Sequence, residues 1–139
     1  MTDTFTKEER SKIMRAVKSK KTSLESKVTK ELWKHGLRFR VNIHDLLGKP
    51  DIAIKKYKIV IFIDSCFFHG CSLHCRIPKS NEEYWVTKIR RNIERDLSVN
   101  RYYNSIGWNV MRVWEHDLKE DFLGTVQKLI QFVNLAKRQ

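Results

Sequence analysis

Residues 59–75 read IVIFIDSCFFHGCSLHC, and this stretch decides the fold. Its first five residues are apolar and mostly β-branched, a pattern typical of a strand that is buried on both faces. The run ends at Asp64, and the loop that follows holds all three cysteines of the chain together with His69 and His74. A rigid buried strand that delivers acidic, imidazole and thiol side chains at its end is a good support for a functional site. We therefore expect the chain to be organised around this strand.

The thiol cluster has two interpretations. Four residues separate Cys66 from Cys71, two more separate Cys71 from His74, and Cys75 is adjacent. Thiolates and imidazoles at this spacing suit tetrahedral zinc. The alternative is a loop of buried thiols or one local disulfide, but an odd cysteine count and no apolar N-terminal segment argue against a secreted disulfide scaffold. The spacing predicts a zinc site whose fourth ligand comes from elsewhere, and His116 could supply it.

Composition limits the function classes. The 139 residues are 41% hydrophobic and 11% aromatic, which predicts a single globular domain with an ordinary core. No apolar run approaches the length of a membrane span. The net charge of +12 favours a polyanionic partner, and aromatic residues interleaved with the basic ones favour nucleic acid over an acidic membrane surface.

Periodicity and turn residues predict the order of the elements. Capping boxes begin three helices, at Thr6 with Glu9, Thr22 with Glu25, and Ser80 with Glu83. The first helix with its basic linker is either a frayed surface helix or an arm that orders on a phosphate backbone. The remaining expected elements are a helix over 22–36, strands over 37–41, 52–54 and 59–63, a long helix over 81–106, a strand over 108–114 and a helix over 122–135.

Several polar residues have a structural and a functional interpretation. Asp51 directly precedes the second predicted strand, where an aspartate is usually a turn residue. The hairpin would nevertheless bring it beside Asp64 and His69, and converging oxygen ligands with an imidazole would suit Mg²⁺-assisted phosphodiester hydrolysis. Glu25 is explained by its helix cap. On the long helix, Trp85, Ile89, Ile93 and Leu97 form an apolar stripe, and the adjacent polar row of Lys88, Asn92 and Asp96 would ordinarily be a solvated face.

The order of helix, three strands, helix, strand and helix, with Pro50 and Asp51 opening the second strand, is the core pattern of PD-(D/E)xK nucleases. More specifically, the sequence resembles the very-short-patch mismatch repair endonucleases (Vsr) over residues 10–118. Many separate blocks in one order make the resemblance specific. The blocks are Met14 with Thr22 and Glu25; residues 48–51, 66–71 and 78–81; Trp85 with Lys88; Asn92, Glu94, Arg95 and Asp96; Gly107 and Trp108; and residues 114–116.

The resemblance implies a restriction-endonuclease-like α/β fold: an αβββαβα core whose mixed central sheet is flanked by helices, with a structural zinc site. It implies a DNA-clamping arm over residues 1–21 and one endonuclease domain over 22–139. The implied activity is a nick 5′ to the thymine of a T·G mismatch in double-stranded DNA, left by deamination of 5-methylcytosine. The implied setting is a monomer in the bacterial cytoplasm, associated with the nucleoid and linked to a DNA cytosine-5 methyltransferase and mismatch-repair proteins.

The same resemblance implies roles for individual residues. Asp51 and the backbone carbonyl of Ile63 bind Mg²⁺, His69 is the general base, and Glu25 and Asp96 hold metal-bound waters or orient His69. Three further sets follow. Cys66, Cys71, His74 and His116 bind zinc; Phe67, Phe68 and Trp85 form a wedge that enters the DNA stack; and Met14, Lys88 and Asn92 contact DNA.

The chain departs from the family pattern at a few positions. Phe62, Ile63 and Asp64 stand where the general nuclease pattern has Glu, any residue and Lys, and the best-known Vsr protein has a histidine at the position of Asp64. Asp64 therefore either binds metal or orients a neighbour. Phe68 replaces the usual tryptophan, and Cys75 competes with His74 as a zinc ligand. Two alternatives stay open: a restriction- or homing-type nuclease of the same fold, and a non-catalytic zinc-bearing DNA-binding domain.

Overall fold

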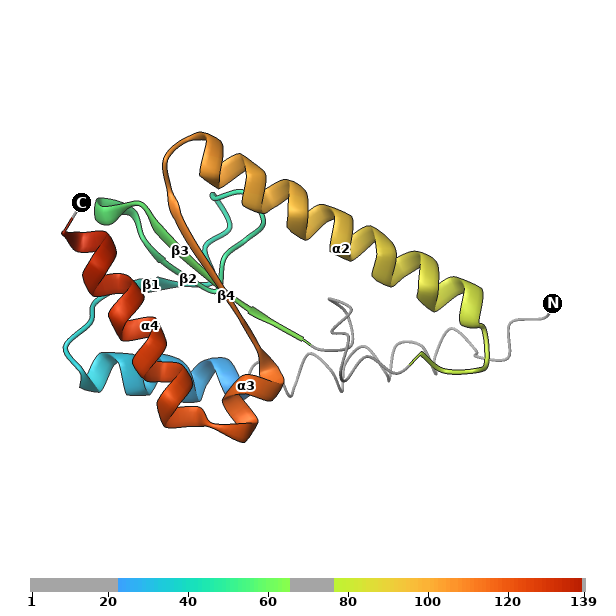
Figure 1. The fold of residues 1–139 in the computed structure, drawn as a ribbon, viewed down its shortest axis with the longest axis horizontal. Coiled ribbons are helices and arrows are strands. Elements are labelled where there is room, and N and C mark those ends of the chain that lie inside the picture. The colour runs from blue at the N-terminus through green and yellow to red at the C-terminus, as the bar shows by residue number, and fades with distance from the viewer. Residues whose placement is uncertain (1–22, 66–76, 139) are drawn as a thin grey trace.

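A computed structural model describes residues 23–65 and 77–138 (Figure 1). A mixed four-stranded sheet lies between helices, with strands in the order β1, β2, β3, β4; the first two pairings are antiparallel and β3 pairs with β4 in parallel. This arrangement confirms the predicted α/β architecture. The elements are a helix over residues 23–34, β1 (Arg40–Val41), β2 (Ile52–Ile54), the 3₁₀ helix η1 (Lys55–Tyr57), β3 (Ile59–Asp64), α2 (Glu82–Ser105), β4 (Asn109–Trp114), α3 (Glu115–Glu120) and α4 (Phe122–Lys137).

Strand β3 is the centre of the molecule, as its apolar sequence predicts. All six of its residues are buried. Ile59, Ile61 and Ile63 pack with the 23–34 helix and α4 on one face of the sheet. On the other face, Val60 and Phe62 pack with two residues of α2, Val99 and Tyr103. Successive side chains of a strand point to opposite faces, so one strand contributes to both cores. Burying an aliphatic or aromatic side chain of this size contributes about 1.5–3 kcal/mol, which makes β3 a rigid support for whatever follows it.

The loop between β1 and β2 is held against α2. The Tyr103 hydroxyl donates a hydrogen bond to the Leu47 carbonyl at 2.5 Å. Burial raises the pKa of that hydroxyl, so it remains a donor. The neighbouring Gly48 has a φ of +78°, a conformation that favours glycine. This loop ends at Pro50 and Asp51, so the chain that leads to Asp51 is attached to α2.

Helix α2 buries a different face from the predicted one. Trp85 and Ile89 are buried as expected, but Ile93 and Leu97 are 36% and 51% exposed. A row of every fourth residue advances about 400° per step and so drifts by about 40° around a helix with 3.6 residues per turn. The buried face instead continues through Val99 and Tyr103 and has a polar middle. That middle consists of Asn92, Asp96 and Asn100, all partly buried.

Four other expectations differ from the structure or lie outside it. The strand predicted over 37–41 is only Arg40–Val41, because the Leu37 N–H still closes the preceding helix by donating to Leu32. The Ser80–Glu83 capping box is wrong, since α2 begins after Asn81, which has a φ of +59°. Helix α3 was not predicted, because its six residues are too few to show a helical period. The helix expected from Thr6 lies outside the described residues.

Of the helices in the two described ranges, none is both long and apolar enough to cross a membrane.

Candidate active site

Asp51 lies beside the end of β3, where the predicted hairpin was expected to bring it. Its backbone N–H donates to the carbonyl of Ile61 at 3.1 Å, and Ile61 is also the β3 partner of the next residue, Ile52. Its carboxylate oxygen Oδ2 accepts the backbone N–H of Ile63 at 2.7 Å. The residue is only 9% exposed. Two contacts to one buried strand therefore fix both the main chain and the side chain of Asp51.

The oxygen atoms at this position suit Mg²⁺. The N–H and C=O of one residue in an extended strand point to the same side, and the Ile63 N–H donates to Asp51, so we expect the Ile63 carbonyl on the side of β3 on which Asp51 lies. Mg²⁺ prefers oxygen ligands and commonly takes only one or two protein carboxylates, completing its shell with water and substrate phosphate. Within residues 23–65 and 77–138, no three His, Cys, Asp or Glu side chains gather into a group that could hold a metal ion. A site built from Asp51 and a backbone carbonyl does not require such a group.

A second polar cluster surrounds Arg112 of β4, which pairs in register with Phe62 of β3. The Arg112 guanidinium donates to Asp64 Oδ1 at 2.9 Å through Nη1 and to Asn100 Oδ1 at 2.7 Å through Nε. Asp96 Oδ1 forms an ion pair with the same Nη1 at 3.7 Å. The structure thus brings Asp64 and Asp96 together through an arginine that sequence reasoning missed. An arginine inside a strand gives no local signal of this role.

The carboxyl ends of β3 and β4 lie at the same edge of the sheet, because the two strands are parallel and Asp64 pairs with Trp114. His116 follows in the first turn of α3, where its ring stacks on Trp114 with centroids 6.3 Å apart. Its Nε2 lies 3.3 Å from Asp117 Oδ1. His116 is therefore placed at the edge from which the predicted zinc loop departs.

Of the other predicted site residues, Glu25 and Trp85 lie within the described residues. Glu25 lies partly buried in the first turn of the 23–34 helix. Trp85 is 0% exposed and contacts Tyr84 edge to face at a centroid distance of 4.9 Å. That burial is what the core interpretation of Trp85 predicts, so a wedge role would require Trp85 to become accessible when DNA binds. Several predicted site residues lie outside the described residues: Met14, Cys66, Phe67, Phe68, His69, Cys71, His74 and the competing Cys75.

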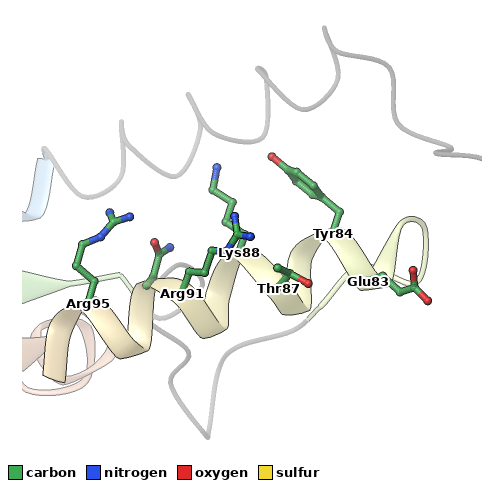
Figure 2. A pocket seen from close by; sticks show the side chains of 7 residues that line it. Glu83, Tyr84, Thr87, Lys88, Arg91 and Arg95 are labelled. Atoms are coloured by element: carbon green, nitrogen blue, oxygen red, sulfur yellow. The ribbon is translucent and has the colours of Figure 1, made fainter. Parts of the chain in front are cut away.

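A basic groove of about 640 Å³ runs along the N-terminal half of α2. Figure 2 shows Tyr84, Lys88 and Arg95 projecting in one direction from the helix, with Arg91 beside them. The Lys88 ammonium lies 5.9 Å from the centre of the Tyr84 ring. Cations interleaved with an aromatic ring on one helix face suit the phosphates and bases of DNA. The groove, which we call the α2 groove, is lined by Glu83, Tyr84, Thr87, Lys88, Arg91, Asn92 and Arg95.

Known proteins resemble the chain over most of its length. A sequence model of one family, described as DNA mismatch endonuclease Vsr, matches residues 2–75. A type II nicking enzyme of Neisseria meningitidis serogroup C is 40% identical over 133 residues, which cover 94% of this chain and 90% of that enzyme. A type II nicking enzyme of Neisseria meningitidis serogroup A is 45% identical over 120 residues, 86% of each chain. The DNA mismatch endonuclease Vsr of Escherichia coli strain K12 is 38% identical over 122 residues, which cover 86% of this chain and 77% of that protein.

Identity at this level extends over both parts of the site. The family match includes the strand pair that carries Asp51, and the alignment of 133 residues includes the helix that carries the α2 groove. The net charge of +12 and the basic lining of that groove fit an enzyme whose substrate is a polyanion. The chain belongs to the Vsr family and is a DNA endonuclease.

Proposed function

We propose that the protein nicks double-stranded DNA in a Mg²⁺-dependent reaction, 5′ to the thymine of a T·G mismatch left by deamination of 5-methylcytosine. The observation that carries the proposal is the buried Asp51 carboxylate, held at 2.7 Å from the Ile63 N–H at the end of the central strand. The family model and the Escherichia coli relative are both described as DNA mismatch endonucleases, which supports the choice of substrate.

Asp51 and the Ile63 carbonyl would hold the Mg²⁺ ion. When bound, the ion would supply charge stabilisation at the scissile phosphate. The protein itself would contribute rigidity, because the Asp51 carboxylate is buried and bonded to the Ile63 N–H at the end of the buried strand β3. His69 would accept a proton from the attacking water, while Glu25 and Asp96 would orient His69 or bind ordered water.

A zinc ion would stabilise the loop that carries His69. Cys66 and Cys71 would supply two ligands, and either His74 or Cys75 the third. His116 would supply the fourth, and its position at the carboxyl edge of the parallel β3–β4 pair supports this part of the proposal.

Mismatch recognition would combine a wedge with contacts along the α2 groove. Three aromatic residues, Phe67, Phe68 and Trp85, would enter the base stack. Unstacking neighbouring base pairs costs a few kcal/mol per base step, and it costs less at a mismatch. Lys88 and Asn92 line the α2 groove, and Met14 would contact DNA from the N-terminal arm. In this proposal residues 1–21 form a DNA-clamping arm, residues 22–139 the endonuclease domain, and the enzyme acts as a monomer alongside a cytosine-5 methyltransferase and mismatch-repair proteins.

A second candidate function is nicking at a DNA site other than a T·G mismatch. The observation that favours it is that the two Neisseria meningitidis relatives are named type II nicking enzymes. Both candidates use the same metal ligands and differ in the substrate.

The test is a nicking assay on T·G and matched T·A duplexes of the same sequence, with and without Mg²⁺. We expect Mg²⁺-dependent cleavage 5′ to the mismatched thymine. Asp51→Asn should abolish nicking while DNA binding survives, and His69→Ala should slow it by about 10²–10⁴-fold, the usual contribution of a general base. Lys128→Met, on the exposed face of α4, is the control. Equal nicking of both duplexes would support the second candidate, and normal cleavage by Asp51→Asn would overturn the site.

A further inference from the structure

Arg112 occupies the point at which three elements of the site meet. It belongs to β4, and its guanidinium contacts Asp64 at the end of β3 and both Asn100 and Asp96 on α2. Its side chain is only 16% exposed, and those of Asp64 and Asp96 are 6% and 19% exposed. The central guanidinium carbon lies 4.1 Å from the centre of the Phe62 ring. The side chain of Arg112 therefore lies between the sheet and α2, and its charged group contacts the carboxylates of Asp64 and Asp96.

The contacts use the specific geometry of arginine. A guanidinium is planar and presents several N–H donors in a fixed fork, whereas the ammonium of lysine is a single point charge. Here Nε and Nη1 donate to different elements, and the central guanidinium carbon lies over an aromatic ring. A lysine at this position could make one of these contacts but not the set.

The partly buried carboxylates also need such a partner. A carboxylate that is removed from water is costly unless a cation or hydrogen-bond donors accompany it. Asp64 directly follows Ile63, whose carbonyl is a proposed Mg²⁺ ligand, and Asp96 is in the polar middle of the buried face of α2. The position of Arg112 thus explains how acidic side chains can be packed next to the metal site between the sheet and a helix.

We propose that Arg112 is a positioning residue of the nuclease site. It holds Asp64 and Asp96 in a fixed arrangement and thereby fixes α2 relative to the end of β3. In this proposal Asp64 is the anionic partner of Arg112 and not a Mg²⁺ ligand. The expected effect of Arg112 on DNA cleavage rests on the proposed function. The contacts of Arg112 with Asp64, Asp96 and Asn100 are observed and do not depend on it.

The first experiment compares Arg112→Met, which keeps the apolar contact with Phe62, with Arg112→Lys, which keeps the charge. The matched control is Arg101→Met, an exposed arginine of α2 that donates only to its own helix at the Leu97 carbonyl among the hydrogen bonds described for it. The measurements are the single-turnover nicking rate at saturating DNA, the DNA affinity and thermal melting. They are made on whichever duplex the wild-type enzyme cleaves, so failure of the T·G assignment does not affect them.

We expect Arg112→Met to lower the single-turnover rate by about 10–100-fold, the usual effect of losing a group that orients metal-site residues. DNA affinity should be unchanged, and Arg112→Lys should recover part of the rate. Arg101→Met should nick at the wild-type rate. A normal rate in folded Arg112→Met, or a loss confined to DNA affinity, would overturn the proposal.

The second experiment needs no DNA, and its main measurement is made on the wild-type protein. In ¹H–¹⁵N spectra of the wild-type protein, a guanidinium held by Asp64 and Asn100 should show slowly exchanging side-chain N–H signals that are absent in the exposed Arg101. Asp64→Asn should shift the Arg112 signals. If the Arg112 side-chain signals exchange as rapidly as those of Arg101, the contacts do not persist in solution and the proposal fails.

Discussion

At the scale of single residues, a glycine sets the position of the loop that leads to Asp51. Gly48 has a φ of +78°, and a Cβ added there would lie 2.9 Å from Val99 Cγ1 and 3.3 Å from Phe62 Cε1. Gly36 has a similar φ of +85°, but an added Cβ would meet nothing within 4 Å. An alanine at Gly36 would therefore carry only the cost of the backbone conformation, whereas an alanine at Gly48 would carry that cost and the cost of a steric clash.

We expect Gly36→Ala to lower the free energy of unfolding by about 1–2 kcal/mol, the conformational cost of a left-handed residue. Gly48→Ala should lower it by about 1–3 kcal/mol more, because the extra methyl overpacks the contact between the loop and α2. Urea denaturation with an unchanged m-value measures the difference. If both variants lose the same free energy of unfolding, the loop at Gly48 can move to accommodate the methyl group, and the clash contributes nothing.

At the scale of elements, α2 performs two tasks with two faces. Its inward face is apolar at both ends and polar in the middle, and three of its basic side chains, Lys88, Arg91 and Arg95, line the α2 groove. The inward face joins the helix to β3 and β4, so the groove is held in a fixed position relative to Asp51. Figure 1 shows the N-terminal part of α2 reaching beyond the strands.

We expect Arg91→Met and Arg95→Met each to weaken binding to all duplexes by a similar factor. Each variant should also reduce the slope of log affinity against log salt by about 1, because one fewer counterion is released. Lys128→Met on α4 removes the same charge from the opposite side of the sheet and should leave the slope unchanged. If all three variants change the slope equally, DNA is bound by net charge alone and not in the α2 groove.

At the scale of the whole molecule, the proposed zinc site would join the ends of two parallel strands. Cys66 follows β3 in the sequence by two residues, and His116 follows β4 by two residues, so a shared metal would close the carboxyl edge of the sheet. Structural zinc sites contribute about 10–16 kcal/mol of apparent binding energy in small peptides, which is enough to decide whether such a loop folds.

We expect one tightly held zinc ion per chain. Cys66→Ser and Cys71→Ser should lose the metal and lower the melting temperature, whereas Cys75→Ser should retain both. Metal analysis of the purified variants and thermal melting are the measurements. If His74→Ala retains zinc and Cys75→Ser loses it, the third ligand is Cys75 and not His74. If the wild-type protein contains no zinc, the zinc site is wrong and the cysteines belong only to a thiol-rich loop.

The sequence by itself determined the central strand, the mixed order of elements and the family. These features depend on local patterns: an apolar run of β-branched residues, turn residues at its ends, and blocks of residues in a characteristic order. The convergence of Asp51 on the end of β3 could also be predicted, because a short basic turn joins the two strands and leaves few ways to pair them.

Only the tertiary structure decided which face of α2 is buried and what lies against it. The predicted stripe is buried only as far as Ile89, because a row of every fourth residue drifts around the helix, and the buried face continues through Val99 and Tyr103 instead. The cluster of Asp64, Asp96, Asn100 and Arg112 joins residues up to 48 positions apart in the sequence. No periodicity links such residues, since their proximity results from the parallel pairing of β3 with β4 and the packing of α2 across both strands.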